Sequence, residues 1–459
     1  MTAIGSPDRP LRVAVIGSGP SGFYAAEALL KSDLNTEVNM FDRLATPYGL
    51  VRLGVAPDHE KIKNVIKVYE RIAAKDGFAF FGNVHVGKDI SIEELRPYHD
   101  AIVLAYGAES DRRLGIAGED FSGSHTATAF VAWYNGHPDF RDATFDLSQE
   151  TAVVIGQGNV AADVCRILAK TVDELKATDI AQHALDALAE SNIKHIHMIG
   201  RRGPVQAKFT QLEIKELGKL DDCDPVVKSE DLDFDPASQA ELDSPDNKNA
   251  PKIVTVLREF AERSPLTKNR KLHFQFRKSP IEIVGAGRVK KIVLETNELT
   301  GEPFRIKARG SGHTEELPCG LVFRSVGYRG EAMPGVPFDD GWGIVPNKDG
   351  RVLDGDAPVP GLYAVGWIKR GPTGVIGTNK PDSQATVEAL LEDIGSAPAS
   401  PKRNNAALLE DLARRRLRVV SFSDWDSINA AEISRGEEAG KSREKFTRLD
   451  DIFRILDHK

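Results

Sequence analysis

The sequence predicts an α/β protein with two dinucleotide-binding domains. Two observations predict this class. At residues 11–30 an apolar strand runs into a glycine-rich turn and then a helix pattern, and the same order recurs at residues 152–169. A glycine-rich turn between a strand and a helix is typical of dinucleotide-binding folds, in which one such unit opens one sheet. Two units therefore indicate two nucleotide-binding domains rather than a single sheet.

The composition is that of a folded chain with two or three domains. Of the 459 residues, 41% are hydrophobic and 28% are charged, which excludes a wholly disordered chain. No apolar run approaches the roughly 20 residues that a membrane helix needs, and the short polar start leaves no room for a signal peptide. We therefore expect a cytoplasmic protein. The net charge of −8 argues against generic binding to nucleic acid.

The first glycine turn carries a complete G-x-G-x-x-G pattern, formed by Gly17, Gly19 and Gly22. Such a turn lets the backbone approach a pyrophosphate, which then lies at the helix N-terminus. An acidic residue at the end of the next strand normally binds the ribose hydroxyls. Asp42 follows the apolar run 38–41 and supplies this group. Strand, helix and acid together favour dinucleotide binding over an incidental turn.

The second turn, Gly156-Gln-Gly158-Asn-Val-Ala161, has the alanine that the pattern allows at its third position. Its next strand ends in Arg201 and Arg202 instead of an acid. Two guanidinium groups suit a ribose 2′-phosphate, which favours NADP(H) over NAD(H). The interval from Gly156 is longer than the usual 20 or so residues, and a helical insertion at 172–191 would account for it. The alternative is a solvated basic turn.

Two dinucleotide sites in one chain indicate a flavin and a nicotinamide that exchange a hydride. A third glycine cluster, between Gly361 and Gly377, follows a late apolar strand. Residues 271–326 contain short alternating runs separated by turns, which predict a meander of antiparallel strands. Those runs are His273–Phe276, Ile281–Val284, Val289–Glu295, Phe304–Ala308 and Leu321–Val326.

Three other segments have distinct characters. The acidic stretch 221–250 is expected to be a surface excursion. Residues 395–405 are typical of a linker, and they precede two helical patterns at 406–419 and 447–456.

At four long motifs the chain resembles the adrenodoxin-reductase-like NADPH–ferredoxin reductases, a family with a glutathione-reductase-type fold. The motifs are Gly-Ser-Gly-Pro-Ser-Gly-Phe-Tyr (17–24), Tyr-Gly-Leu-Val-Arg-Leu-Gly-Val-Ala-Pro-Asp-His (48–59), the second glycine turn with Gly-Arg-Arg-Gly-Pro (200–204), and Gly-Trp-Ile-Lys-Arg-Gly-Pro-Thr-Gly-Val-Ile-Gly-Thr (366–378). The resemblance implies two Rossmann-like domains, with the NADP-binding domain (111–329) inserted into a discontinuous FAD-binding domain (1–110 and 330–395). A C-terminal helical tail (396–459) follows, and we expect it to contribute packing only.

The resemblance also implies roles for individual residues. The predicted FAD contacts are Ser21, Asp42, Leu50 and Val86, with Trp367 and the backbone of Gly374, Val375 and Ile376 against the flavin ring. The predicted NADP contacts are Gln157, Gly158, Asn159 and Val160 at the pyrophosphate, Arg201 and Arg202 at the 2′-phosphate, and Glu213 at the nicotinamide end. His59 is expected near the flavin as a proton relay, with Asp163 or Glu216 as its polar partner. The family usually has Glu where this chain has Asp42, which is one methylene shorter, so we expect ribose contact here to need a water.

Two of these residues have an alternative interpretation. His59 is equally explained as a loop histidine bonded to backbone, because hydride transfer needs no acid or base to break the C–H bond. Trp367 either stacks on the flavin or fills the core. No histidine pattern typical of a metal site is present, so we expect no metal.

The implied activity is transfer of a hydride from NADPH to N5 of FAD, followed by single-electron transfer to an acidic iron–sulfur ferredoxin, which can feed haem monooxygenases. Basic residues that could receive an acidic partner form three clusters: Arg201/Arg202/Lys208/Lys215, Lys268/Arg270/Lys271/Arg277/Lys278, and Lys369/Arg370. A disulfide reductase is disfavoured because Cys165, Cys223 and Cys319 form no pair motif. An NADPH-oxidising flavoprotein or flavin monooxygenase stays open, as does a non-catalytic redox sensor.

Overall fold

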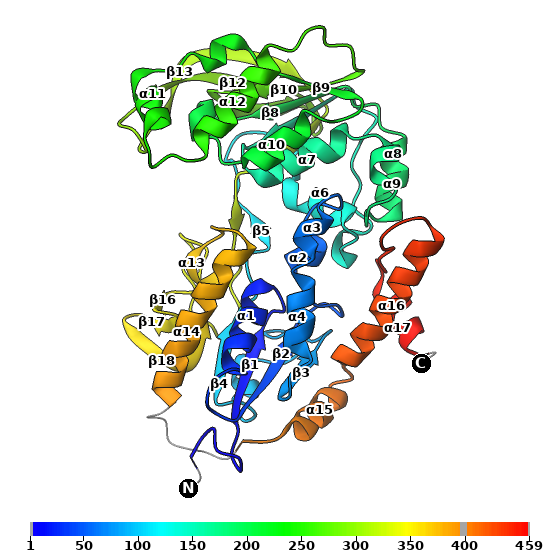
Figure 1. Cartoon of the computed structure of the whole chain (residues 1–459), viewed down its shortest axis with the longest axis vertical. Coiled ribbons are helices and arrows are strands. Elements are labelled where there is room, and N and C mark those ends of the chain that lie inside the picture. Colours follow the sequence, from blue (N-terminus) through cyan, green and yellow to red (C-terminus); the bar gives the residue numbers. More distant parts are fainter. Residues whose placement is uncertain (1–2, 395–401, 458–459) are drawn as a thin grey trace.

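The computed structural model describes residues 3–394 and 402–457, and it consists of two lobes (Figure 1). One lobe is built on a sheet with the strand order β16-β17-β18-β4-β1-β2-β3. Its strands are β1 (Leu11–Ile16), β2 (Thr36–Phe41), β3 (Phe78–Phe81), β4 (Ala101–Leu104), β16 (Asn347–Lys348), β17 (Arg351–Asp354) and β18 (Ala357–Ala364). β18 pairs in parallel with β4, so chain segments from both ends of the sequence share this sheet.

The other lobe is built on a sheet of parallel strands in the order β6-β14-β7-β8-β10-β9. These are β6 (Ser124–Thr126), β7 (Thr151–Ile155), β8 (His195–Ile199), β9 (Cys223–Val226), β10 (Arg270–Gln275) and β14 (Leu321–Arg324). The chain passes between the lobes at β5 (Ser110–Asp111) and β15 (Tyr328–Arg329), which pair with each other. Two nucleotide-type sheets are thus present, while the domain boundaries predicted from the sequence stay a prediction.

The predicted antiparallel meander is only partly right. β11 (Lys278–Gly285), β12 (Val289–Thr300) and β13 (Lys307–Pro318) form it. The runs at 273–276 and 321–326 belong to β10 and β14 of the parallel sheet, and Phe304 precedes its strand. The alternation of apolar and polar residues did not distinguish strands of the parallel sheet from strands of the meander. Both faces of the parallel sheet are covered, because Val154 packs toward the helices and Val153 toward the meander.

The stretch 221–250 is more ordered than predicted. It contains β9, the edge strand of the parallel sheet, and the helix α11 (Pro236–Asp243). Pro225 within β9 disguised the strand, and it is tolerated there because an edge strand leaves one row of hydrogen-bonding groups unpaired.

Helices cover the sheets and connect their strands. In the first lobe, α1 packs against α14, and in the second lobe α7, α10 and α12 share a core with β7, β8 and β10. The helices before residue 200 are α1 (Pro20–Leu29), α2 (Leu50–Leu53), α3 (Glu60–Lys63), α4 (Ile66–Ala73), α5 (Ile92–Leu95), α6 (Ala127–Tyr134), α7 (Asn159–Ala169), α8 (Val172–Leu175) and α9 (Gln182–Ala189). Those that follow are α10 (Gln211–Leu217), α11, α12 (Ala250–Ala261), α13 (Trp367–Arg370), α14 (Asn379–Ile394), α15 (Asn405–Arg414), α16 (Phe422–Glu438) and α17 (Leu449–Asp457). Within the described residues, no helix has the length and apolar character to cross a membrane.

The tail does more than pack. It contains α16, which the sequence did not predict, as well as the expected α15 and α17; residues 395–401 of the predicted linker lie outside the described residues. Glu432 on α16 is fully buried and accepts two hydrogen bonds from Arg52 of the first lobe, at 2.6 and 2.9 Å. Lys445 is buried against Asp179 of the second lobe, at 3.0 Å, and Lys63 contacts the same carboxylate. The tail therefore joins the two lobes through buried ion pairs.

We predict that Glu432→Gln lowers the free energy of unfolding by about 3–5 kcal/mol, because it leaves the buried guanidinium of Arg52 without a counter-charge. Denaturant unfolding of the purified protein measures this change. The matched control is Glu438→Gln, an exposed carboxylate on the same helix, which should change the value by less than about 0.5 kcal/mol. Equal effects of the two substitutions would contradict a structural role for the buried pair.

Candidate functional site

The first glycine turn joins β1 to α1 and leaves space for a ligand. Gly17 has φ +108°, and a Cβ on it would lie 2.5 Å from the carbonyl oxygen of Ala105, so only glycine fits. A Cβ on Gly22 would lie 2.1 Å from the Gly17 oxygen. Around Gly19, by contrast, no atom of the described residues outside its chain neighbours lies within 4 Å of a built Cβ. The turn is thus closed toward the sheet and open at the helix N-terminus, as a pyrophosphate requires.

The carboxylate of Asp42, directly after β2, is already partly used. It accepts hydrogen bonds from the Ser18 amide (3.0 Å), the Ser18 hydroxyl and the Leu44 amide (2.9 Å). Burial raises its pKa. A carboxylate offers about four acceptor positions, so one remains for a ribose hydroxyl, and the ribose contact stays a prediction.

The third glycine cluster lies against the first turn. A Cβ on Gly366, which has φ +73°, would lie 2.3 Å from the hydroxyl oxygen of Ser21, so the two segments are in close contact. The ring of Trp367 packs on Tyr328 with a centroid distance of 5.3 Å, and its indole N–H donates to the Thr373 carbonyl. Trp367 is only half-buried and therefore does not fill the core. Val375 is 63% exposed, which leaves the 374–376 backbone accessible to a ring.

The two other predicted FAD contacts differ in exposure. Leu50 is partly exposed at the start of α2, so its side chain is available to a ligand. Val86 is buried in the core and forms a backbone bridge with Ile90, so its side chain is not available to a ligand. Neither contact is tested by the structure, and both stay predictions.

The second glycine turn repeats the geometry of the first. A Cβ on Gly156 (φ +143°) would lie 2.2 Å from the Ser325 carbonyl oxygen, whereas Gly158 is again open. Asn159 and Val160 follow Gly158 in the first turn of α7, where backbone N–H groups lack intrahelical partners. The side-chain nitrogen of Gln157 is buried without a hydrogen-bond partner among the described residues. This turn therefore presents several donors to an anion.

A basic pair lies beyond this turn. Arg201 is exposed and Arg202 half-buried just after β8, and within residues 3–394 and 402–457 neither guanidinium forms an ion pair. Burial and the charge of Arg201 lower the pKa of Arg202. Two neighbouring cations that repel each other are stabilised by an anion placed between them, and a phosphate has the matching geometry.

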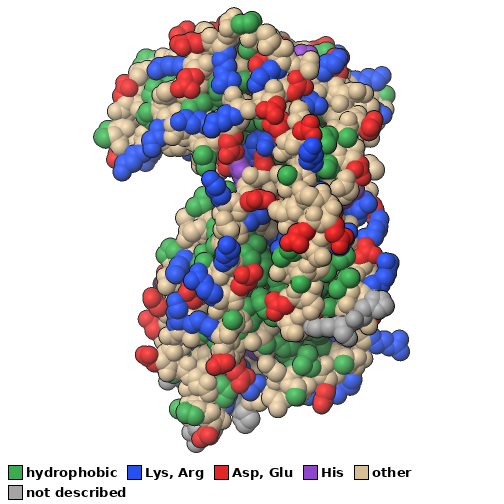
Figure 2. All heavy atoms as spheres, turned by 45° about the vertical axis from the view of Figure 1, so that its right-hand side comes forward, with side chains coloured by type: hydrophobic (Ala, Val, Ile, Leu, Met, Phe, Trp, Pro, Cys, Tyr) green, Lys and Arg blue, Asp and Glu red, His purple; other side chains and the backbone are tan. Residues whose placement is uncertain are grey.

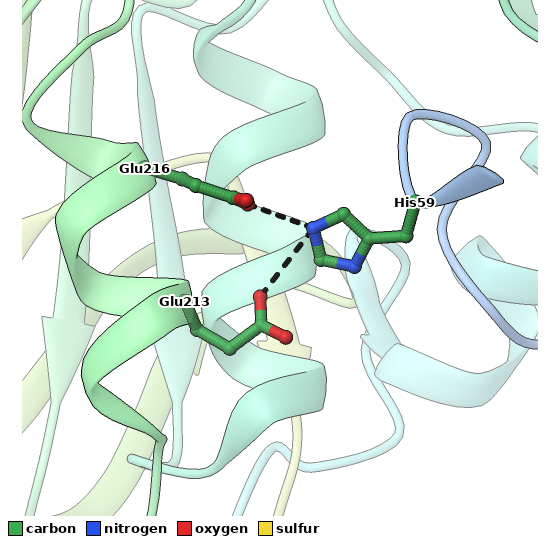
Figure 3. Close-up of side chains that lie close together, drawn as sticks. All are labelled: His59, Glu213 and Glu216. Atoms are coloured by element: carbon green, nitrogen blue, oxygen red, sulfur yellow. Dashed lines mark hydrogen bonds and ion pairs between the residues drawn. The ribbon is translucent and has the colours of Figure 1, made fainter. Parts of the chain in front are cut away.

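A buried cluster of charged groups joins the lobes beside both turns. Figure 3 shows His59 from the first lobe pointing at Glu213 and Glu216 of α10. The His59 Nε2 atom lies 2.7 Å from Glu216 and 3.7 Å from Glu213. Asp163 does not touch His59; it pairs with Arg166, at 2.7 Å. The predicted residues His59, Asp163 and Glu216 thus lie in one cluster, and Glu216 rather than Asp163 is the hydrogen-bond partner of His59.

The pKa values of Glu213, His59 and Glu216 in this cluster are shifted from their ordinary values. Burial, followed by the charge of Asp163, raises the pKa of Glu213 to about 7. Burial lowers the pKa of His59, but the hydrogen bond to Glu216 and the charges of Asp163 and Glu213 raise it by more. The hydrogen bond to His59 in turn lowers the pKa of Glu216. The titration of Glu213 is therefore linked to that of His59, because each charge acts on the other group.

Arg166 is the central member of this cluster and was not among the residues predicted from the sequence. Arg166 is buried on α7 and contacts Asp58, Asp163 and Glu213. A signal was present: Asp163 and Arg166 are three residues apart in an otherwise apolar helix, a spacing at which side chains pair. His59, Glu213 and Glu216 have ligand atoms within 4.8 Å of one another, but the Arg166 guanidinium already supplies a positive charge to them. The absence of a metal stays a prediction.

The fold and its two glycine turns are those of an oxidoreductase with two dinucleotide sites, one of them for a pyridine nucleotide. Residues 11–215 match the family model described as pyridine nucleotide-disulphide oxidoreductase. The chain is 46% identical to the NADPH-ferredoxin reductase FprA of Mycobacterium tuberculosis, over 97% of this chain and 99% of that one. It is 42% identical to the mitochondrial NADPH:adrenodoxin oxidoreductase of Mus musculus, over 97% and 92%. The chain belongs to the adrenodoxin-reductase-like NADPH–ferredoxin reductase family.

A solved structure agrees with this membership. The structure titled Mycobacterium tuberculosis FprA in complex with NADPH superposes with a TM-score of 0.93, at 46% identity and over 97% of this chain and 99% of that one. The expected family and the glutathione-reductase-type class are thereby confirmed. Cys165, Cys223 and Cys319 are all free and buried, so the redox cysteine pair of a disulfide reductase is lacking.

We predict that Gly158→Ala weakens NADPH binding at least about tenfold, which is about 1.4 kcal/mol, while the protein stays folded. The φ of Gly158 (−111°) suits alanine, and no described atom beyond its chain neighbours crowds the new methyl group, so only an approaching phosphate meets it. Titration of NADP⁺ into the protein measures the affinity, and thermal unfolding checks the fold. Gly19→Ala, the equivalent change in the first turn, should instead reduce flavin retention. Unchanged NADPH affinity in Gly158→Ala would refute the predicted pyrophosphate position.

Proposed function

We propose that the chain is an NADPH:ferredoxin oxidoreductase that uses FAD to divide the electron pair of NADPH between two single-electron transfers to an iron–sulfur ferredoxin. The observation that carries the proposal is the unpaired Arg201–Arg202 couple beyond the second glycine turn, because it suits a 2′-phosphate that NADH lacks. The names of the relatives support the two substrates. FAD, when bound, accepts a hydride at N5 and releases electrons singly.

The residues of the chain bind and orient both nucleotides. The first turn, with Gly17, Gly19, Ser21 and Gly22, holds the FAD pyrophosphate, and residues 374–376 lie against the flavin ring. Residues 157–160 hold the NADP pyrophosphate at the N-terminus of α7. Glu213, which is itself buried, lies at the nicotinamide end. His59 and Glu216 hold the proton of the coupled cluster rather than break the C–H bond.

The partner is proposed to dock by charge at one of the three basic clusters. In the second cluster Lys271 pairs with Asp224, and in the third cluster Lys369 and Arg370 share the one carboxylate of Asp382. Both clusters are thus partly neutralised within the chain. Lys208 and Lys215, with the arginine pair, form no ion pair within the described residues. Figure 2 shows a hollow between the lobes with lysine and arginine side chains along its upper edge. Because Arg201 and Arg202 are assigned to the 2′-phosphate, Lys208 and Lys215 of this first cluster are the best candidates to receive an acidic ferredoxin.

We predict that electron transfer to an acidic ferredoxin falls about tenfold between low and physiological salt, because screening weakens charge steering. Reduction of the flavin by NADPH in the same stopped-flow experiment should change little. Lys208→Gln with Lys215→Gln should slow ferredoxin reduction at low salt and flatten its salt dependence. Lys252→Gln, an exposed lysine on α12, is the control and should behave as wild type. A flat salt response in the wild type would contradict docking by charge.

The alternative is an NADPH-oxidising flavoprotein or flavin monooxygenase that uses oxygen or another acceptor. It predicts that peroxide formation exceeds ferredoxin reduction when both acceptors are present. A haem monooxygenase downstream of the ferredoxin belongs to the same proposal. A cytoplasmic location belongs to it as well, and the three free, buried thiols support that location.

A further inference from the structure

One guanidinium contacts carboxylates from both lobes. Arg166 lies on α7, about two helical turns after the start of the helix at the second glycine turn, and its side chain is 1% exposed. It donates two hydrogen bonds to Asp58, at 2.8 and 3.0 Å, and thereby holds in place the residue that directly precedes His59. It also contacts Glu213 at 3.1 Å and Glu216 at 3.8 Å. A single side chain thus connects the segment that carries His59 to the helix that carries Glu213.

The charges of this cluster do not balance without protons. Four carboxyl groups, those of Asp58, Asp163, Glu213 and Glu216, face only two permanent cations, Arg166 and Lys170. Buried charges are tolerated only when they are paired. Water solvates part of the charge of Glu216, which is one-third exposed, and protons on His59 and Glu213 supply positive charge or remove negative charge from the buried part of the cluster. The number of protons taken up depends on the charge that Arg166 contributes.

The pKa shifts agree with this arrangement. The charge of Arg166 lowers the pKa of both His59 and Glu213, whereas the charge of Asp163 raises both. Burial raises the pKa of Asp163 itself. The phenols of Tyr134 on α6 and Tyr328 on β15 also experience the charge of Asp163, and burial keeps both neutral.

We propose that Arg166 is a positioning residue for hydride transfer: it fixes the Asp58–His59 segment against α10 and sets the number of protons on the His59–Glu213 pair at the nicotinamide end. This inference rests on the proposed function. It assigns Arg166 no contact with either nucleotide. Its effect passes through His59 and Glu213, so it should appear in how the reaction depends on pH, as well as in the rate.

The test compares the pH profiles of flavin reduction by NADPH in variants that change the charge of the cluster in opposite directions. Arg166→Met removes the cation, and the inflection near pH 7 should move upward by about one unit or more. Asp163→Asn removes an anion, and the inflection should move downward. Arg166→Lys retains the charge and should retain the wild-type inflection while reducing the rate. Arg258→Met, an exposed arginine on α12, is the control.

A second readout does not depend on turnover. In the FAD-loaded protein without NADPH, histidine-labelled NMR titration, with His59→Gln to assign the signal, should show that His59 takes up its proton at higher pH in Arg166→Met. Should that variant fail to fold, Asp163→Asn and Arg166→Lys still carry the test. The inference would be overturned if Arg166→Met and Asp163→Asn lost rate equally at every pH and kept the wild-type inflection, with the His59 titration also unmoved. Failure of the wild type to be reduced by NADPH would instead overturn the proposed function.

Discussion

The arrangement of the two nucleotide sites depends on the ion pair between Asp58 and Arg166. Asp58 belongs to the segment after α2 in the first lobe, and Arg166 to the helix that begins at the second phosphate-binding turn. Their two hydrogen bonds, both within 3.0 Å, are buried and charge-assisted, which makes the contact strong and directional. Because Asp58 and Arg166 belong to different lobes, this contact helps to fix how the two glycine turns are oriented toward each other.

The C-terminal tail ties the lobes at a second place, with the same chemistry. Glu432 holds Arg52, while Asp179 receives both Lys63 and Lys445. Burial lowers the pKa of Lys445 to about 7, so this tie is itself costly to keep charged. A chain with this many buried ion pairs between its lobes gains little net stability from them compared with apolar packing, but it gains a defined orientation. A hydride donor and acceptor need that orientation, because transfer requires close and aligned rings.

The local motifs were predictable from sequence, whereas the contacts between distant segments were not. Sequence spacing alone predicts the roles of Gly17, Gly156 and the arginine pair after β8. The family resemblance predicts that His59 and Glu213 belong to one site. Arg166 was missed because its partners lie on three separate segments. The strands β10 and β14 were assigned to the wrong sheet for a related reason: a short apolar run has the same pattern whichever neighbour it pairs with.

In the proposed function, Arg201 and Arg202 bind the 2′-phosphate of NADPH, and the second glycine turn binds its pyrophosphate and brings that nucleotide to the flavin. Anaerobic stopped-flow reduction of the FAD-loaded protein by NADPH and by NADH tests it most directly, with Arg201→Ala/Arg202→Ala as the comparison. We expect both nucleotides to be compared by the concentration that gives half the maximal rate of flavin reduction. For the wild type this apparent affinity should be at least about a hundredfold better for NADPH than for NADH, and the double variant should lose most of this preference. Equal reduction of the wild type by both nucleotides, or an unchanged preference in the variant, would contradict it.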